Sequence, residues 1–345
     1  MANCCVQLIT TKMKRVGYLI DRIADVDNLL QAYYQARRGK HDKYGVKEYG
    51  KNLTDNILCL RRQILSTEVD VGKYHYFKIY DPKERQICAA PFSERVLHHA
   101  IINVCKPYFE RHLIYDTYAT RDGKGVYAAI DRARVAMKKY RYVAKLDVRK
   151  YFDSISHTVL KTKLRRLFKD PYLLTILEKI IDTYHVEPGR GIPIGNLTSQ
   201  YFANYYLSSV DHSMKENLSV PVYIRYMDDI LLFADRREDI YRYVEEIELI
   251  MHRTVLLNLK PAVVQQTQYG ISFLGYMLYP HKILLNRRSK IRFRKKLQMY
   301  EQYRQSGRWS EVQYLQHITP LLSFAQKAFT HGMRNDICNR YCNSR

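Results

Sequence analysis

Two apolar segments joined by a short acidic link constrain the fold of this chain more than any other feature. Val222–Tyr226 and Ile230–Phe233 flank Met227-Asp228-Asp229, a pattern typical of a β-hairpin with carboxylates at its tip. Far upstream, the apolar segment Tyr142–Val148 predicts a strand with Asp147 near its end. The carboxylates of the two segments can meet only if both strands are neighbours in one sheet.

Carboxylates gathered in this way would suit divalent metal ions. Phosphoryl transfer uses two such ions, one at the attacking hydroxyl and one at the leaving pyrophosphate. Mg²⁺ takes hard oxygen ligands and keeps several waters, so two or three carboxylates suffice. A strand ending in Asp, or an Asp pair in a hairpin, is more often a solvated turn, so the interpretation depends on their joint appearance.

The charge of the chain indicates a polyanionic partner. The 345 residues include 57 Lys and Arg against 34 Asp and Glu, a net charge of +23, together with 31 Tyr. Such a surface favours nucleic acid, whose bases stack on aromatic rings, and the alternatives are a solubility surface or an anionic membrane. Residues 281–345 are especially basic, with 14 Lys and Arg against 3 Asp and Glu. Ser289–Tyr303 is predicted to be a basic helix with Ile291, Leu297 and Tyr300 on its inner face.

No targeting or metal-binding cysteine pattern is evident in the sequence. The seven Cys are scattered without zinc spacing, which predicts free thiols in a reducing cytosol. The sequence has no signal-peptide pattern and no stretch of about 18 apolar residues, so we expect a cytoplasmic protein with no membrane span.

The remaining segments alternate between helical and extended patterns. Residues 18–65 predict helices, and residues 74–91 predict two strands. Ser93 begins a predicted helix that Pro107 should end, and Asp170-Pro171 should interrupt the helical stretch after the first acidic strand.

Four motifs, in order and spacing, resemble those of reverse transcriptases. Tyr226-Met227-Asp228-Asp229 resembles the YxDD box, and Leu146–Ile155 resembles the first metal-binding motif. Gly191–Gln200 resembles the nucleotide-side loop, and Phe273-Leu274-Gly275-Tyr276 resembles the turn that contacts the primer. The resemblance extends from about residue 70 to residue 280.

The resemblance implies an α+β fold of the right-hand polymerase type, built from fingers, palm and thumb. Residues 1–140 would form the fingers with an N-terminal helical extension. Residues 141–280 would form an antiparallel split-βαβ palm, with a fingers insertion near 160–198. Residues 281–345 would form a short, basic, helical thumb, which leaves no room for the maturase domain of group II intron enzymes.

The resemblance also implies residue roles at the reacting centre. Asp147, Asp228 and Asp229 would be catalytic and would bind two Mg²⁺ ions, for which Mn²⁺ is a substitute. The Val148 carbonyl would assist them. For Asp229, a simple turn carboxylate is the alternative.

Further residues are implied to bind the incoming nucleotide. Arg85 and Lys83 would grip the triphosphate, although Lys83 can equally be a solvated turn lysine. Phe152 would be the steric gate against the ribose 2′-hydroxyl, with core packing beside Tyr151 as the alternative. The full set comprises Lys83, Arg85, Phe152, Ile194, Gly195, Gln200 and Lys260, of which Lys260 belongs to a loose pattern.

The template and primer would contact two other regions. Arg121, in Tyr118–Gly125, resembles a second fingers motif near the template. The complete set implied or expected to bind the template–primer comprises Arg121, Phe273, Leu274, Gly275, Arg292, Lys295 and Lys296.

The nucleotide-side loop carries a subfamily resemblance. Most bacterial relatives have a QGxxxSP pattern, whereas this chain has Ile194 in place of the Gln and Gln200 in place of the Pro. That pattern is similar to reverse transcriptases of diversity-generating retroelements, a bacterial or phage-encoded group. They copy a template-repeat RNA into cDNA, misincorporate opposite adenine, and imply a small basic helical accessory protein as partner.

We therefore expect RNA-directed DNA synthesis from a primer and dNTPs. A group II intron or retron-type enzyme of ordinary fidelity is the main alternative. A catalytically silent RNA-binding scaffold is another, which the intact set of Asp147, Asp228 and Asp229 disfavours.

Overall fold

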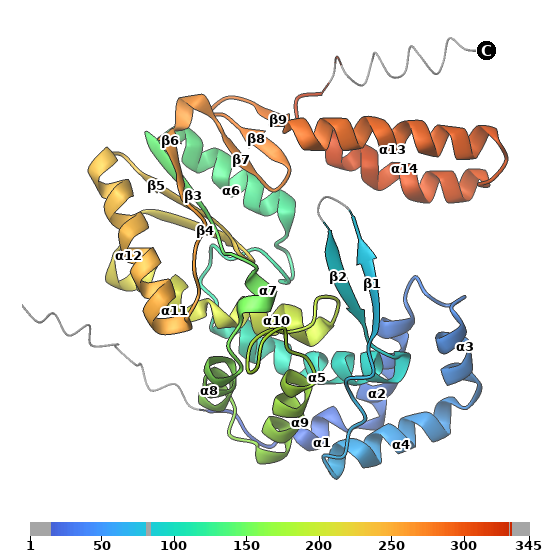
Figure 1. The fold of residues 1–345 in the computed structure, drawn as a ribbon. Coiled ribbons are helices and arrows are strands. Elements are labelled where there is room, and N and C mark those ends of the chain that lie inside the picture. The colour runs from blue at the N-terminus through green and yellow to red at the C-terminus, as the bar shows by residue number, and fades with distance from the viewer. Residues whose placement is uncertain (1–14, 81–83, 331, 333–345) are drawn as a thin grey trace, which may run out of the picture. The chain divides into compact units, whose positions relative to one another are not determined.

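A computed structural model describes residues 15–80, 84–330 and 332 (Figure 1). The chain divides into two compact units, each made from two stretches of sequence. Unit 1 combines the chain up to Leu113 with Lys150–Ser208, and unit 2 combines Ile114–Arg149 with the chain from Ser209 onwards. Each unit is described by itself.

Unit 1 is mainly helical and carries one two-stranded antiparallel sheet. Its elements are α1 (Ile20–Ile23), α2 (Val26–Arg37), α3 (Tyr44–Lys51), α4 (Leu53–Leu65), β1 (His75–Ile79), β2 (Arg85–Ala89), α5 (Phe92–Arg111), α7 (Tyr151–Ser154), α8 (His157–Leu167), α9 (Pro171–Asp182) and α10 (Leu197–Tyr206).

Helix α5 forms the centre of unit 1, packed against α2 and α10. The prediction that Pro107 ends this helix is wrong, because α5 continues through it to Arg111. Cys105 and Phe109, on either side of the proline, are both buried. Packing therefore outweighs the lost backbone hydrogen bond. The predicted break at Asp170-Pro171 is confirmed, since the Asp170 side chain caps α9 by accepting from the Leu173 N–H.

Unit 2 contains two antiparallel sheets and the helices that cover them. Its elements are α6 (Val126–Lys139), β3 (Tyr142–Asp147), α11 (Ser208–His212, whose first residue belongs to unit 1), the π-helix η1 (Ser213–Asn217), β4 (Val222–Tyr226), β5 (Asp229–Ala234), α12 (Arg237–Val255), β6 (Val263–Gln266), the 3₁₀ helix η2 (Thr267–Tyr269), β7 (Ile271–Phe273), β8 (Tyr276–Leu278), β9 (Ile283–Leu285), α13 (Arg287–Gln305) and α14 (Glu311–Gln326).

The larger sheet has the strand order β4-β5-β3-β6. β5 pairs antiparallel with both β3 and β4, and the register places Asp147 opposite Asp229. The condition for the carboxylates to meet, that the acidic strand and the acidic hairpin are neighbours in one sheet, is therefore met.

Alternation along the strands gives the larger sheet two different faces. Val143, Ile224 and Phe233 belong to a core cluster with α6, the smaller sheet, α13 and α14. α12 contacts β3 and β5, and it lies on the other side of the sheet from α6 (Figure 1). Because residues two apart share a face, Asp147 and Asp229 lie on the α6 side.

α13 and α14 form an antiparallel helical pair whose core differs from the predicted one. Phe293 and Leu297 are buried, whereas Ile291 is 48% exposed. The predicted inner face was thus wrong at Ile291, since the buried stripe of α13 runs through Ser289, Phe293 and Leu297. The ring of Tyr276 in β8 contacts that of Phe324 in α14, with centroids 4.7 Å apart.

The predicted mixture of helices and antiparallel sheets is confirmed, while the fingers, palm and thumb boundaries stay predictions. Cys59, Cys88 and Cys105 are free thiols, and the other four Cys lie outside the described residues. None of the helices in the described ranges is both long and apolar enough to span a membrane.

Candidate active site

Two neighbouring strands bring Asp147 and Asp229 together. They are register partners at the ends of β3 and β5, and both are half-buried. Lys145 precedes Asp147 by two residues, so it shares the same face, and its Nζ lies 3.3 Å from Asp229 Oδ1. The sequence analysis missed Lys145, although a lysine at this spacing in an apolar strand was a usable signal.

Asp228 lies in the two-residue turn that joins β4 to β5. Tyr226 pairs with Asp229, so Met227 and Asp228 form the tip, and Met227 has a φ of +53°. Burial raises the pKa of Asp228 to about 6, and repulsion from Asp229 and Asp147 adds to this. Its own backbone N–H and Lys260 act in the opposite direction on this pKa. Burial first, and the neighbouring carboxylates second, therefore make ionised Asp228 unfavourable, and a bound cation would stabilise the charged form.

Lys260 binds Asp147 through both its backbone and its side chain. The Lys260 N–H donates to the Asp147 carbonyl at 2.9 Å, and its Nζ lies 2.5 Å from Asp147 Oδ1. Next to this contact, Val148 pairs with Leu259 in an isolated antiparallel bridge. The structure thus places the predicted Lys260 beside the first carboxylate.

The donor set fits hard divalent cations in its chemistry, as three carboxylates share one end of the sheet. The arrangement is not closed around such an ion, because Lys260 and Lys145 each pair with one carboxylate. Within residues 15–80, 84–330 and 332, no three His, Cys, Asp or Glu side chains are placed so that they could hold a metal ion together. Bound cations would have to displace these two ammonium groups.

The predicted nucleotide-side loop of unit 1 is anchored to β2 by its backbone. The Cys88 N–H donates to the Ile194 carbonyl at 2.8 Å. Gly195 has a φ of +124°, and a Cβ there would lie 2.9 Å from the Cys88 carbonyl oxygen. Glycine is thus required by the approach of β2. The Ile194 side chain is half-buried, and the anchoring bond does not use it.

The other predicted nucleotide-binding residues of unit 1 lie on separate elements. The Phe152 ring is half-buried and packs edge-on against Tyr151, and its carbonyl accepts from the Ile192 N–H. Arg85 begins β2 and is exposed, and Gln200 is half-buried in α10. Lys83 lies outside the described residues.

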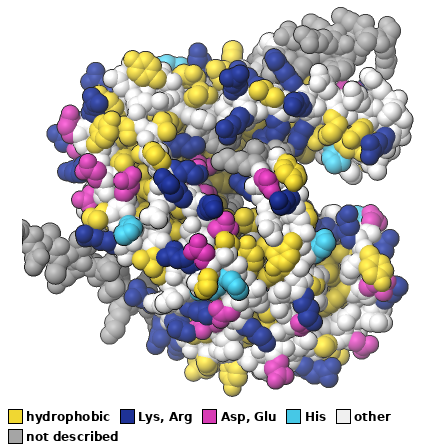
Figure 2. Space-filling model, viewed as in Figure 1, with side chains coloured by type: hydrophobic (Ala, Val, Ile, Leu, Met, Phe, Trp, Pro, Cys, Tyr) yellow, Lys and Arg dark blue, Asp and Glu magenta, His cyan; other side chains and the backbone are white. Residues whose placement is uncertain are grey.

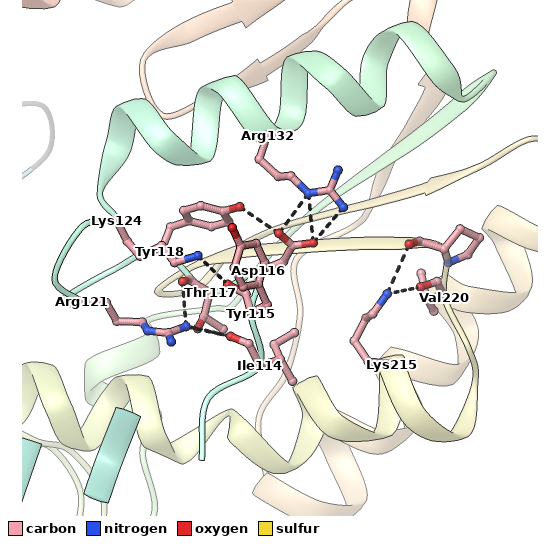
Figure 3. A network of polar contacts seen from close by, with 11 residues as sticks. Ile114, Tyr115, Asp116, Thr117, Tyr118, Arg121, Lys124, Arg132, Lys215 and Val220 are labelled. Atoms are coloured by element: carbon pink, nitrogen blue, oxygen red, sulfur yellow. Dashed lines mark hydrogen bonds and ion pairs between the residues drawn. The ribbon is translucent and has the colours of Figure 1, made fainter. Parts of the chain in front are cut away.

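Arg121 belongs to a polar network in unit 2 (Figure 3). Its Nη1 donates to the carbonyls of Ile114 and Thr117 and to the Thr117 hydroxyl. These bonds close the loop that precedes α6. Arg121 therefore organises its own loop in this structure, and its contact with a template stays a prediction.

The predicted primer-contacting turn joins β7 to β8. Leu274 and Gly275 both have positive φ, +46° and +90°. The Phe273 side chain is fully buried in the core of unit 2, so a side-chain contact between Phe273 and a primer does not fit this structure. Leu274 and Gly275 are half-buried, and their primer contact stays a prediction.

Arg292 and Lys296 line a groove of about 310 Å³ between α13 and α14. They are one helical turn apart and therefore share a face, with Tyr300, His317 and Phe324 also lining the groove. Lys295 is exposed beside them. Lys and Arg side chains also spread over much of the face in Figure 2, so positive charge is not confined to this helical pair.

Comparison with known proteins gives the family. Residues 80–278, more than half of the chain, match the model of the family described as reverse transcriptase (RNA-dependent DNA polymerase). The chain therefore belongs to the reverse transcriptase family, and it is an enzyme of the RNA-directed DNA polymerase class.

Individual relatives are distant. The chain is 23% identical over 293 residues to protein YkfC of Escherichia coli, covering 70% of this chain and 77% of that protein. It is 22% identical over 219 residues to the putative COX1/OXI3 intron 1 protein of Saccharomyces cerevisiae, covering 59% of this chain and 26% of that protein. The structure of apo telomerase from Candida tropicalis superposes with a TM-score of 0.48 at 11% identity, covering 62% of this chain and 48% of that one.

Proposed function

We propose that this protein copies an RNA template into DNA at the site formed by Asp147, Asp228 and Asp229, with the fidelity of a diversity-generating retroelement enzyme. The observation that carries the polymerase site is the register of β3 and β5, which sets Asp147 opposite Asp229 beside the tip carboxylate. On this proposal the larger sheet is the palm, α13 and α14 are the thumb, and β1 and β2 belong to the fingers.

The three carboxylates would hold two Mg²⁺ ions together with the Val148 carbonyl. Such ions, when bound, activate the primer 3′-hydroxyl and stabilise the leaving pyrophosphate. Lys260 and Lys145 would release Asp147 and Asp229 at that point. The freed ammonium of Lys260 would then be available to the negatively charged triphosphate.

Substrate binding would be shared among basic and aromatic side chains. Arg85 is exposed at the start of β2, and its planar guanidinium suits a triphosphate. Phe152 would exclude the ribose 2′-hydroxyl. Arg292 and Lys296 in the groove of α13 and α14, with Lys295 beside them, would bind template–primer phosphates.

The error-prone character would depend on Ile194. An amide at this position can direct a hydrogen bond toward the incoming nucleotide or its pair, whereas an aliphatic side chain offers shape alone. Without that hydrogen bond, a mispair is disfavoured less strongly relative to a correct pair. The difference required is small, because one hydrogen bond contributes about 1 kcal/mol and a tenfold change in rate is about 1.4 kcal/mol. Adenine–thymine pairs, with two hydrogen bonds, would depend most on outside support.

The test is to replace Ile194 by Gln and to sequence cDNA copied from an RNA that contains all four bases. The loop should keep its place, since its anchor to Cys88 uses the Ile194 carbonyl. Ile194→Met is the matched control, because Met has nearly the length of Gln but no amide. We expect errors opposite adenine to fall about tenfold in Ile194→Gln and to stay unchanged in Ile194→Met.

Two results would contradict the subtype. One is an active Ile194→Gln enzyme with the same adenine error rate as the wild type. The other is a wild-type enzyme that is equally accurate at every template base. The latter result would favour a group II intron or retron-type enzyme. The proposal includes a small basic accessory protein as partner only if the enzyme is of the retroelement subtype.

A further inference from the structure

Arg225 is among the largest fully buried side chains of the described residues. It lies on β4, two residues before Met227, in a strand that is otherwise apolar or aromatic. A buried guanidinium is costly unless its charge and its donors are satisfied. Its partners therefore indicate why the strand contains it.

The charge of Arg225 is neutralised by Asp211 of α11. Arg225 Nε donates to Asp211 Oδ1 at 2.7 Å, and Nη2 donates to Oδ2 at 2.6 Å. Both side chains are fully inaccessible to solvent. The Tyr223 hydroxyl donates to the same carboxylate at 2.7 Å. The ion pair is thus bidentate, buried and held by a third residue.

A buried ion pair of this kind seldom adds stability over apolar residues of the same size. The distinctive property of such a pair is that two donors of the planar guanidinium fix its orientation on the carboxylate, which leaves a further donor for another acceptor. Here the remaining donor has a specific target.

Arg225 Nη1 donates to the Met227 carbonyl oxygen at 3.1 Å. Because the peptide unit is planar, fixing this carbonyl also fixes the amide and the Cα of Asp228. The turn needs this support, since Met227 has a φ of +53°, a left-handed conformation that is unfavourable for a residue with a side chain.

The base of the Arg225 side chain is fixed as well. Its N–H donates to the Asp116 carbonyl at 3.0 Å, and its carbonyl accepts from the Tyr118 N–H at 2.9 Å. On β5 it pairs with Ile230. Backbone bonds on both sides and Asp211 at the guanidinium leave the side chain little freedom to move away from Met227.

We infer that Arg225 is a positioning residue, which holds the Met227–Asp228 peptide so that the Asp228 carboxylate faces the reacting centre from the face of the sheet opposite to Arg225. The inference rests on the proposed function for the role of Asp228. Sequence analysis missed Arg225, although an arginine within an apolar strand was a usable signal.

The experiment replaces the whole buried network by apolar residues of similar size. The variant Asp211→Leu/Tyr223→Phe/Arg225→Met removes the two opposite charges together, so that neither is left buried alone, and it takes the Arg225 donor from the Met227 carbonyl. We expect it to fold with a thermal unfolding temperature close to that of the wild type. Its kcat for primer extension should fall by more than about tenfold with little change in the KM for dNTP.

The reporting measurement is hydrogen exchange of the backbone amides from Met227 to Asp229, which needs neither metal nor substrate. Exchange there should accelerate by about tenfold or more in the apolar variant. Arg225→Lys should give an intermediate effect, since one ammonium keeps the charge opposite Asp211 but cannot reproduce the fork.

The chain provides a matched control in α13 and α14 of the same unit. Arg304 pairs with Glu301, its Nε donating to Glu301 Oε2 at 3.1 Å, and the Tyr314 hydroxyl donates to Glu301 Oε1. The variant Glu301→Leu/Arg304→Met/Tyr314→Phe removes an acid, an arginine and a tyrosine from unit 2 without changing a residue that contacts Arg225. Its kcat and its exchange at the Met227–Asp229 turn should stay within about threefold of the wild type.

Wild-type kcat and wild-type exchange in the Asp211/Tyr223/Arg225 variant would overturn the inference. If that variant does not fold, the same two results for Arg225→Lys would overturn it. Equal losses in the Glu301/Arg304/Tyr314 variant would show a general effect of the stability of unit 2 and would also overturn it. A wild type without polymerase activity would instead refute the proposed function, and the exchange comparison would still test the contact with Met227.

Discussion

Two hairpins of unit 2 reverse the chain with two residues each, but they do so with different chemistry. The turn between β7 and β8 uses Leu274 and Gly275, both with positive φ. The turn between β4 and β5 uses Met227 and Asp228, of which Met227 has positive φ. In the first turn, Gly275 adopts a positive φ without steric cost. The second turn contains no glycine, and the Arg225 side chain donates to its Met227 carbonyl.

The two turns differ in chemistry because the first packs against neighbouring side chains and the second carries a carboxylate at its tip. A Cβ at Gly275 would lie 3.0 Å from Phe324 Cζ and 3.1 Å from Ser289 Oγ, so that turn is shaped by packing. The Met227–Asp228 turn presents a carboxylate, and freedom of its backbone would spread that carboxylate over many positions. A strained turn held by a buried charge therefore suits a site where geometry matters more than stability.

The largest effect should come from the carboxylate at the second tip. Asp228→Asn keeps the size of the side chain but removes a ligand charge, so primer extension should fall by roughly three orders of magnitude or more. Asp235→Asn, at an exposed residue just after β5, is the control and should retain wild-type extension. Extension rates of both variants on an RNA template would check this, and near-normal extension by Asp228→Asn would remove Asp228 from the site.

A smaller effect, on stability, should come from the first tip. Gly275→Ala adds a Cβ at a φ of +90° and presses it against Phe324, so unfolding of unit 2 should become easier by about 1–2 kcal/mol. Hydrogen exchange of β7 and β8 amides would measure the loss, and extension per folded molecule should fall much less than in Asp228→Asn.

Met227→Gly is the converse change for this comparison. Glycine adopts a positive φ without strain, so the free energy of unfolding should change by no more than about 1 kcal/mol. The backbone of the turn then has more freedom, so the rate of primer extension should fall. If Gly275→Ala were harmless and Met227→Gly left extension unchanged, the contrast between the two turns would be unfounded.

Much of this fold was predictable because its strands and helices have strong local patterns. The acidic hairpin, the paired strand that ends at Asp147, and the break at Asp170-Pro171 all follow from apolar runs and turn residues. Continuation of α5 past Pro107 was not predictable, because contacts of Phe109 with distant residues decide it. The exposure of Ile291 has the same cause, since only the position of α14 selects the buried face of α13.

In the candidate site, the three carboxylates were predictable from the sequence, and their partners were less so. Asp147, Asp228 and Asp229 stand out by motif, and Lys260 was found through the resemblance. Lys145 and Arg225 stand out as charged residues in apolar strands, but their partners Asp229 and Asp211 lie far away in the sequence, so local sequence could not identify those contacts. Phe273 belongs to the predicted primer-contacting motif but has its side chain in the core, so any contact it makes with a primer would use its backbone and stays a prediction.

The most direct test of the central claim is RNA-templated DNA synthesis by the wild-type chain. An RNA template with an annealed DNA primer is incubated with dNTPs and Mg²⁺, with parallel reactions in which a chelator removes the metal and excess Mg²⁺ or Mn²⁺ then restores it. The account predicts full-length cDNA with the metal, none after chelation, and recovery on re-addition. A folded wild-type protein that binds the template–primer but adds no nucleotide with either metal would contradict it.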